Sequence, residues 1–306
     1  MSSIRARAPI GAAMFALLFA CAAARAHGIL GARFFPPTIS TDDPFAVDEL
    51  AFPTVSYVKN PTDDSGLATH ELDAGFEFDK EILPRLALGV SNSFIYTKAY
   101  DHPAVYGWSN LTFTAKYELW ENAEHEAIVS FGLETDFGST GSQKLGVDNF
   151  TTLAPKLYFG KGFGDLPDTL AGLRPFAVTG TLDYTFPLRT AAPNAFEWGF
   201  AIQYSLQYLQ QNVKDVGLVE PFKNMIPLVE FAMSTQVNRQ PGRGITTGTI
   251  NPGVLYETDW FQIGAEANIP INRASGAHVG VTIQMWIYID DIFPRTFGHP
   301  LFGERS

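Results

Sequence analysis

The sequence contains a single cysteine, Cys21, among its 306 residues. A disulfide framework and a site built from cysteine thiolates are therefore excluded.

Basic residues are also scarce, because 21 lysines and arginines stand against 32 acidic residues and leave a net charge of −11. A chain without a basic patch does not neutralise phosphates, so nucleic acid is not an expected partner.

Long apolar runs are absent after the first 26 residues. A helix needs ~18 apolar residues to span a bilayer, so a helical membrane protein is excluded. The one apolar run, residues 10–24, follows Arg5 and Arg7 and ends in the triplet Ala24-Arg25-Ala26. This layout predicts a Sec-type signal peptide over residues 1–26 and an exported chain. Because the leader carries three arginines and no acidic residue, its removal changes the net charge to −14.

Two alternatives concern the same leader. Residues 18–21 resemble a lipoprotein acylation site, which would make an acylated Cys21 the first residue of the exported chain. Cleavage after Ala26 would instead expose the amine and imidazole of His27, a pair that can chelate copper. No second ligand is identifiable from spacing, so the sequence predicts no metal and no cofactor.

Catalytic motifs are absent as well. The chain has no GxSxG, no HExxH and no P-loop. A barrel hydrolase would need a histidine beside a serine on neighbouring strand ends, and His278 is the candidate that the sequence leaves open. We therefore predict no catalytic residue, with an outer-membrane lipid hydrolase kept as an alternative.

What the sequence does have is alternation with a period of two residues. In residues 69–80, apolar Leu72, Ala74, Phe76 and Phe78 alternate with acidic Glu71, Asp73, Glu77 and Asp79. Such a strand has one apolar face and one charged face. Twelve strands are predicted over residues 49–59, 68–80, 85–97, 107–120, 126–137, 150–160, 173–187, 196–210, 225–237, 246–257, 260–270 and 276–289. Between them, residues 160–172 and 211–224 are predicted to hold short helical turns.

These strands favour a transmembrane barrel over a soluble sandwich. Strands of globular proteins usually run ~5–6 residues, whereas membrane strands need ~9–11, and the predicted strands match the second value. The 25 phenylalanines, 11 tyrosines and 5 tryptophans suit a lipid-facing wall with aromatic girdles. We predict an all-β protein, an antiparallel up-and-down transmembrane β-barrel of about 12 strands.

The polar face of the strands would then line a lumen. On this pattern Phe131 and Phe200 face lipid. The predicted lumen residues are Glu71, Asp73, Glu77, Lys116, Glu134, Asp136, Gln203, Glu266 and Gln284.

Residues outside the strands complete the predicted organisation. Residues 27–48 form a non-strand segment, 49–289 the barrel, and 290–306 a C-terminal periplasmic extension. The first of these segments is too apolar for a disordered tail, so it is predicted to enter the barrel mouth as a plug or gate, or to serve as a periplasmic segment. Its predicted plug residues are Phe34, Phe35, Asp42 and Asp43.

Residues 251–272, taken with Tyr288-Ile289-Asp290-Asp291-Ile292-Phe293-Pro294, resemble bacterial outer-membrane proteins of the phenol-degradation meta-pathway group. The resemblance consists of proline and glycine punctuation, Gln-x-Gly-x-Glu alternation and the final strand. It implies an outer-membrane channel or transporter-like barrel for small molecules, hydrophobic or aromatic ones among them. It also implies outer-membrane lipid, the barrel-assembly machinery and a small-molecule solute as partners. One departure is that this chain continues past its last strand instead of ending on an aromatic residue there.

A structural or accessory barrel with a filled lumen is the main alternative to this function. A barrel of about 12 strands encloses only a narrow pore, which side chains can fill.

Overall fold

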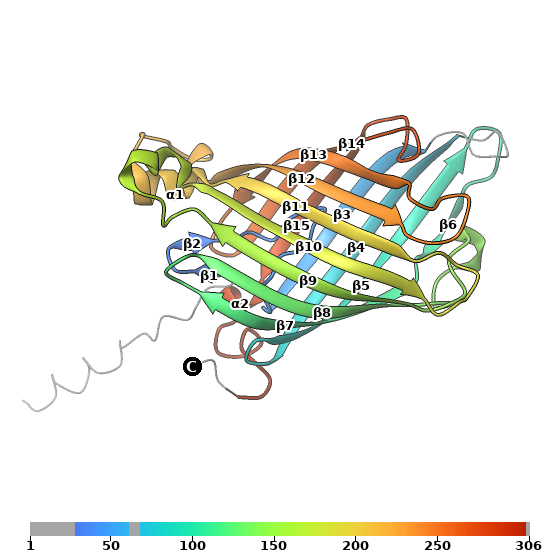
Figure 1. Cartoon of the computed structure of the whole chain (residues 1–306), viewed down its shortest axis with the longest axis horizontal. Coiled ribbons are helices and arrows are strands. Elements are labelled where there is room, and N and C mark those ends of the chain that lie inside the picture. The colour runs from blue at the N-terminus through green and yellow to red at the C-terminus, as the bar shows by residue number, and fades with distance from the viewer. Residues whose placement is uncertain (1–27, 61–67, 304–306) are drawn as a thin grey trace, which may run out of the picture.

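A computed structural model describes residues 28–60 and 68–303 of the chain. The predicted signal peptide, with Cys21, and His27 lie outside the described residues, as do residues 61–67 and 304–306. Twelve long antiparallel strands form a closed barrel (Figure 1). They are β3 (Glu49–Asn60), β4 (Thr69–Leu83), β5 (Leu86–Ala99), β7 (Leu111–Asn122), β8 (Ala127–Phe137), β9 (Thr152–Gly162), β10 (Phe176–Pro187), β11 (Ala195–Tyr204), β12 (Met225–Gln236), β13 (Thr246–Glu257), β14 (Phe261–Pro270) and β15 (Gly280–Tyr288).

Closure comes from the pairing of the first barrel strand with the last. Each strand pairs with the next along the chain, and β15 pairs with β3 from Val281 opposite Tyr57 to Tyr288 opposite Glu49. A short strand, β6 (Val105–Trp108), takes the place of β7 beside the second half of β5. The predicted all-β antiparallel barrel with twelve strands is confirmed.

The two faces of the wall differ as the alternation requires. Phe131 on β8 is 47% exposed on the outside, whereas its neighbour Ser130 is fully buried on the inside. Exposed apolar residues of the outer wall include Tyr57, Leu72, Tyr117, Leu133, Leu157, Leu182, Ile202, Val254, Ile263 and Ile283. Buried polar residues of the inner wall include Asp79, Lys116, Thr179, Gln203, Glu230, Asn251, Gln262 and Thr282. An apolar outside around a polar inside is the arrangement of a barrel in a bilayer.

The two ends of the barrel are distinguishable. We call the end that holds residues 28 and 303 the terminal end, and the opposite end the far end (Figure 1). Exposed aromatic side chains ring both ends, with Tyr96, Tyr106 and Trp108 towards the far end and Trp120 and Trp260 towards the terminal end. Tyr and Trp side chains at these levels form the girdles that sit at the membrane–water interfaces.

Short helices lie in the connections rather than in the wall. They are η1 (Gln143–Leu145), η2 (Asp168–Leu173), α1 (Leu206–Tyr208), η3 (Leu209–Val213), η4 (Phe222–Asn224) and α2 (Ile289–Ile292). Helical turns therefore occupy both connections for which the sequence predicted them. None of the helices in the described part of the chain is long and apolar enough to cross a membrane.

One strand prediction was wrong at its end. Residues 196–210 were expected to form a single strand, but β11 stops at Tyr204 and α1 begins two residues later. The hydroxyl of Ser205 accepts a hydrogen bond from the backbone N–H of Tyr208 at 3.1 Å and caps the helix. Serine caps helices well because its oxygen satisfies an N–H that has no partner inside the helix. The alternating pattern of residues 196–210 predicted that Leu206 and Tyr208 face lipid. They instead belong to the helix and not to the strand.

The outer wall leads to a test of the membrane assignment. Phe131→Arg places a charge near the middle of the lipid-facing wall, which costs about 2–4 kcal/mol in barrels of this kind. Thr247→Arg, on the inner wall, should cost much less because its guanidinium reaches water. Urea titration of the protein folded in lipid, read by the mobility difference between heated and unheated samples, measures both. Equal stability of the two variants would contradict the assignment of faces.

Candidate solute pathway and the N-terminal segment

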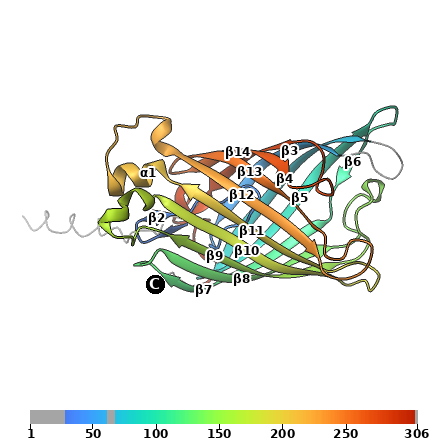
Figure 2. The ribbon, with the colours of Figure 1, turned by 45° about the horizontal axis from the view of Figure 1, so that its top comes forward.

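Residues 28–48 lie inside the barrel at the terminal end (Figure 2). They begin with a small hairpin of β1 (Ile29–Leu30) and β2 (Arg33–Phe34), so the expectation that residues 27–48 contain no strand was wrong for these four residues. Their apolar side chains then pack with the inner wall in a cluster of Leu30, Phe35, Phe45, Val47, Ile128 and Ala177. Burying a side chain of this size contributes about 1.5–3 kcal/mol. The cluster therefore occupies part of the lumen at the terminal end.

Glu230 fixes the loop at the inner tip of this segment. Its carboxylate, fully buried on β12, accepts the backbone N–H groups of Ile39, Ser40 and Thr41 at 2.7–2.9 Å. The hydroxyl of Thr41 donates to the same carboxylate at 2.9 Å. A carboxylate that accepts several backbone N–H groups is held by charge-assisted hydrogen bonds, which are stronger than neutral ones.

Two neighbouring strands add contacts to the same loop. The Ser40 hydroxyl donates to Glu266 on β14 and accepts from the Asn251 amide on β13 at 2.7 Å. The Gln262 amide donates to the carbonyl oxygen of Pro37 at 2.8 Å. Inward side chains of β12, β13 and β14 therefore satisfy backbone and hydroxyl groups that no secondary structure pairs.

The opposite wall binds the segment through a buried lysine. Lys116 on β7 donates to Asp42 Oδ1 at 2.9 Å and to the carbonyl oxygen of Asp43 at 3.0 Å. Its ammonium also lies 4.9 Å from the centre of the Tyr158 ring. Glu118, two residues further along β7, accepts the backbone N–H of Ala46 at 2.8 Å. The segment is thus tied to both sides of the barrel.

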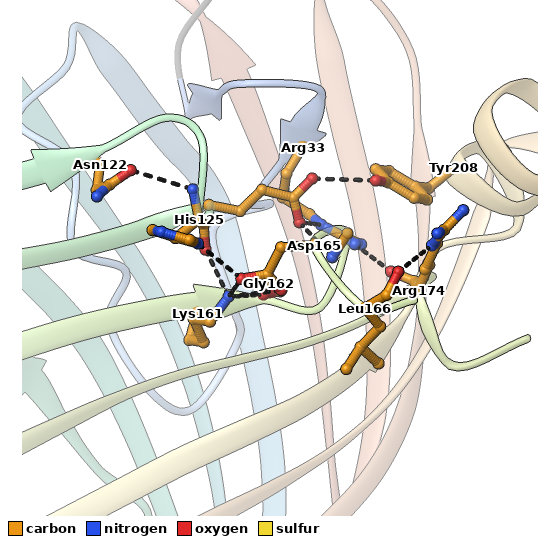
Figure 3. Close-up of polar contacts among 11 residues, drawn as sticks. Arg33, Asn122, His125, Lys161, Gly162, Asp165, Leu166, Arg174 and Tyr208 are labelled. Atoms are coloured by element: carbon orange, nitrogen blue, oxygen red, sulfur yellow. Dashed lines mark hydrogen bonds and ion pairs between the residues drawn. The ribbon is translucent and has the colours of Figure 1, made fainter. Parts of the chain in front are cut away.

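Arg33 ties the start of the segment to the terminal end (Figure 3). Its guanidinium donates to Glu126 at 3.1 Å, to the carbonyl oxygen of Pro175 at 2.9 Å and to that of Arg174. The guanidinium also lies 3.9 Å from the centre of the Tyr208 ring, whose hydroxyl donates to Glu126 at 3.0 Å. Burial, followed by the charge of Glu126, raises the pKa of Tyr208, so this hydroxyl remains a proton donor.

A cavity of about 500 Å³ lies on the far side of residues 38–43. Threonine and serine side chains of the inner wall line it, among them Ser91, Thr112, Thr114, Thr181, Ser234 and Thr247. Its carboxylates are Asp42, Asp43, Glu77, Glu134, Asp183 and Glu197, and Lys156 is its one ammonium. The lining is therefore hydrophilic and carries an excess of negative charge.

The predicted lumen residues fall at several levels of this interior. Glu77 and Glu134 line the cavity, and Lys156 donates to Glu134 at 2.7 Å. Gln284 also lines the cavity, where its amide donates to Thr54 at 3.0 Å. Lys116 and Glu266 contact the N-terminal segment instead, as described above.

The remaining predicted lumen residues lie away from the cavity. Glu71 and Asp73 are nearer the far end, where they accept weak hydrogen bonds at 3.3–3.4 Å from Thr97 and Ser56. Asp136 lies near the far end of β8. Gln203 lies towards the terminal end of β11, where its amide donates to Thr179 at 3.0 Å.

The predicted plug residues divide into two pairs. Asp42 and Asp43 line the cavity and contact Lys116. Phe35 lies in the buried apolar cluster, and Phe34 packs edge-to-face on Tyr288 at a centroid distance of 6.3 Å.

Comparisons with known proteins address the fold. The structure is similar to the COG4313 outer membrane channel from Pseudomonas putida F1, with a TM-score of 0.53 and 12% identity, over 83% of this chain and 99% of that one. The chain has the fold of an outer-membrane β-barrel. At this identity the likeness shows the fold alone. No family model matches the chain, and no curated protein matches it.

Two porins are less similar to this chain. One is a KdgM porin in complex with disordered oligogalacturonate, with a TM-score of 0.44, 10% identity and coverage of 76% of this chain and 98% of that one. The other is the NanC porin, with a TM-score of 0.46, 8% identity and coverage of 78% and 98%.

Of the two histidines named for the hydrolase and metal alternatives, His27 lies outside the described residues. His278 is exposed in the connection between β14 and β15. Among residues 28–60 and 68–303, no group of three or more His, Cys, Asp or Glu side chains is placed to hold a metal ion.

Sequence reasoning named Lys116 and Glu266 but missed other residues that hold the N-terminal segment. Glu230 interrupts the apolar run of residues 225–233, where alternation is hidden. Arg33, Glu126 and Tyr208 come from separate parts of the chain and meet only in the fold. A lone carboxylate within an apolar strand was the one signal in the sequence that pointed to Glu230, because such a group needs a buried partner.

The Glu230 contacts give a local test within the barrel. In Glu230→Gln the amide NH2 group would face backbone N–H donors, and a hydrogen bond to a charged group worth about 1.5–3 kcal/mol would be lost. Hydrogen exchange at residues 39–41 should accelerate roughly 10–150-fold. The amide of Ala46, which Glu118 holds, is the internal control and should exchange at its original rate. Unchanged exchange at residues 39–41 would contradict the role given to Glu230.

Proposed function

We propose that this barrel is an outer-membrane channel for small hydrophilic solutes and that residues 36–43 gate it. The observation that carries the proposal is the cavity of about 500 Å³ directly beside the loop that Glu230 binds. A wall of serine, threonine and carboxylate side chains is compatible with hydrated solutes. The hydrophobic or aromatic solutes implied by the family resemblance fit this lining less well.

The contacts of residues 36–43 are those expected of a gate. Polar side chains hold this loop through hydrogen bonds and one ion pair, and Ile39 adds an apolar contact with the inner wall. Residues 30, 35, 45 and 47 are held mainly by apolar packing. Polar contacts exchange readily for contacts with water, because water offers the same hydrogen bonds. The loop can therefore move while the apolar cluster keeps the rest of the segment in place. We assign the terminal end to the periplasm because three of its five connections, those after β4, β7 and β13, are tight turns, and barrels of this class have short periplasmic turns.

Deletion of residues 28–46 tests the gate. The lumen loses both the loop and the apolar cluster, so single-channel conductance in planar bilayers should rise well above that of the intact chain. The shift in gel mobility on heating shows whether the barrel is still folded. A folded deletion variant with unchanged conductance would contradict the gate. If the deletion fails to fold, the double variant Glu230→Gln/Ser40→Ala loosens the same loop and should raise the frequency of opening.

The charge of the cavity predicts the sign of the solute preference. Six carboxylates and one ammonium line it, so cations should be concentrated there and anions depleted. In a KCl gradient the reversal potential of the open channel should show a preference for K⁺ over Cl⁻. Glu134→Gln with Glu197→Gln should move that potential towards zero, because it removes two charges and leaves Lys156 unpaired. Glu124→Gln, exposed outside the cavity, is the matched control and should have no effect.

A structural barrel with a filled lumen is the second candidate. The buried cluster around Phe35 and Phe45 favours it, because these apolar side chains occupy part of the lumen at the terminal end. The conductance of the intact chain separates the two functions. A gated channel opens in planar bilayers without any deletion, whereas a structural barrel with a filled lumen stays closed.

A further inference from the structure

The C-terminal segment, residues 289–303, follows the outside of the barrel at the terminal end. Lys80 on β4 lies between Asp79 and Glu81, which are both buried on the inner face, so alternation turns Lys80 outward. Its ammonium donates to the carbonyl oxygens of Phe297 and His299 at 2.8 and 2.7 Å. The segment therefore covers an outward-facing side chain of the wall.

Backbone hydrogen bonds fix the segment against the end of β4. The strand β3 begins at Glu49, opposite Asp79, so β4 extends past its neighbour. Beyond that point Asp48 accepts the N–H of Glu81. The N–H groups of Leu301 and Phe302 donate to the carbonyl oxygens of Glu81 and Ile82 at 3.2 and 2.9 Å. Residues 301 and 302 thus pair with β4 beyond the end of β3.

An ion pair lies beneath this cover. Lys80 Nζ lies 2.7 Å from Asp48 Oδ2, and the side chain of Asp48 is almost fully buried. Next to hydrocarbon, an ion pair on an outward face is costly unless other groups shield it and satisfy its hydrogen bonds. The carbonyl groups of the C-terminal segment do both.

The outer surface of the segment is apolar. Phe297 is 70% exposed and Phe302 64% exposed, and Phe293 and Leu301 are exposed beside them. Phe293 and Phe297 pack edge-to-face at a centroid distance of 6.4 Å. This surface continues the lipid-facing wall, because Ile82, whose carbonyl oxygen accepts the N–H of Phe302, lies on the same outward face of β4 as exposed Phe78.

We propose that residues 289–303 are a lipid-binding collar, whose apolar side chains enter the bilayer leaflet at the terminal end. Large apolar side chains with an exposed arginine, Arg295 here, are typical of segments that lie in the interface of a membrane. The phenylalanines occupy the boundary between acyl chains and headgroups, and Arg295 binds lipid phosphate. The partner is the lipid that already surrounds the barrel wall, so the collar extends the membrane contact rather than adding a second interface. The inference does not depend on the proposed channel function.

Spin labels at single cysteines test the collar. In a full-length chain carrying Cys21→Ala, Phe297→Cys and Phe302→Cys are labelled with a nitroxide and reconstituted into vesicles of phosphatidylethanolamine and phosphatidylglycerol. Leu133→Cys on the lipid-facing wall is the lipid reference. Asp168→Cys is the water reference at the same end, because the Asp168 side chain is 96% exposed in η2. Collision with oxygen, which concentrates in lipid, is compared with collision with a water-soluble nickel chelate.

The collar predicts that labels at positions 297 and 302 collide more with oxygen than with the chelate, as at Leu133. Ready access of the chelate, as at Asp168, would place the segment in water and overturn the proposal. Low access to both reagents would mean that a protein surface covers the segment, and this would also overturn it. Both sites are exposed, so labelling leaves the barrel intact, and the heat-dependent gel shift verifies this. Phe293→Cys replaces either variant that fails this check.

Discussion

The closed ladder of backbone hydrogen bonds is the constraint on which the rest of this structure depends. Inside a bilayer no water is present to pair an exposed N–H or carbonyl group, so a membrane-spanning sheet must close on itself. The pairing of β15 with β3 provides that closure. Once the sheet is closed, side chains alternate between lipid and lumen, and the sequence must place apolar and polar residues in strict alternation.

Closure also creates the problem that the N-terminal segment solves. A narrow lumen of twelve strands brings many carboxylates together, and buried carboxylates without partners are costly. Residues 36–46 supply partners, since Glu230 and Glu118 accept their backbone N–H groups. The ammonium of Lys116 donates to the carboxylate of Asp42. Side chains of the wall in turn form the hydrogen bonds that the backbone of residues 37–46 would otherwise lack, because these residues belong to no strand or helix. The segment and the wall therefore depend on one another for their hydrogen bonds.

The ends of the barrel follow different physical rules from its wall. Where β4 extends past β3, its backbone carbonyls are paired by residues 301 and 302 instead of by a strand. Where β11 ends, Ser205 caps a helix and turns Tyr208 towards Arg33 and Glu126. In both places local hydrogen bonds fix the direction of the chain. The segments that they position then contact residues far away in the sequence.

The sequence by itself determined the wall. Alternation around Phe76, Phe131 and Ile263 fixes the faces of their strands, because a strand shifted by one residue would turn its apolar side chains into the lumen. It did not determine where β11 ends, because Leu206 and Tyr208 continue the alternating pattern while Ser205 favours a helix cap. The apolar content of residues 28–48 predicted that this segment enters the barrel mouth, but not which carboxylate would bind it. Only the tertiary structure decided that Glu230, Lys116 and Glu126 bind this segment, because the closed barrel brings the segment beside residues as far as 191 positions away in the sequence.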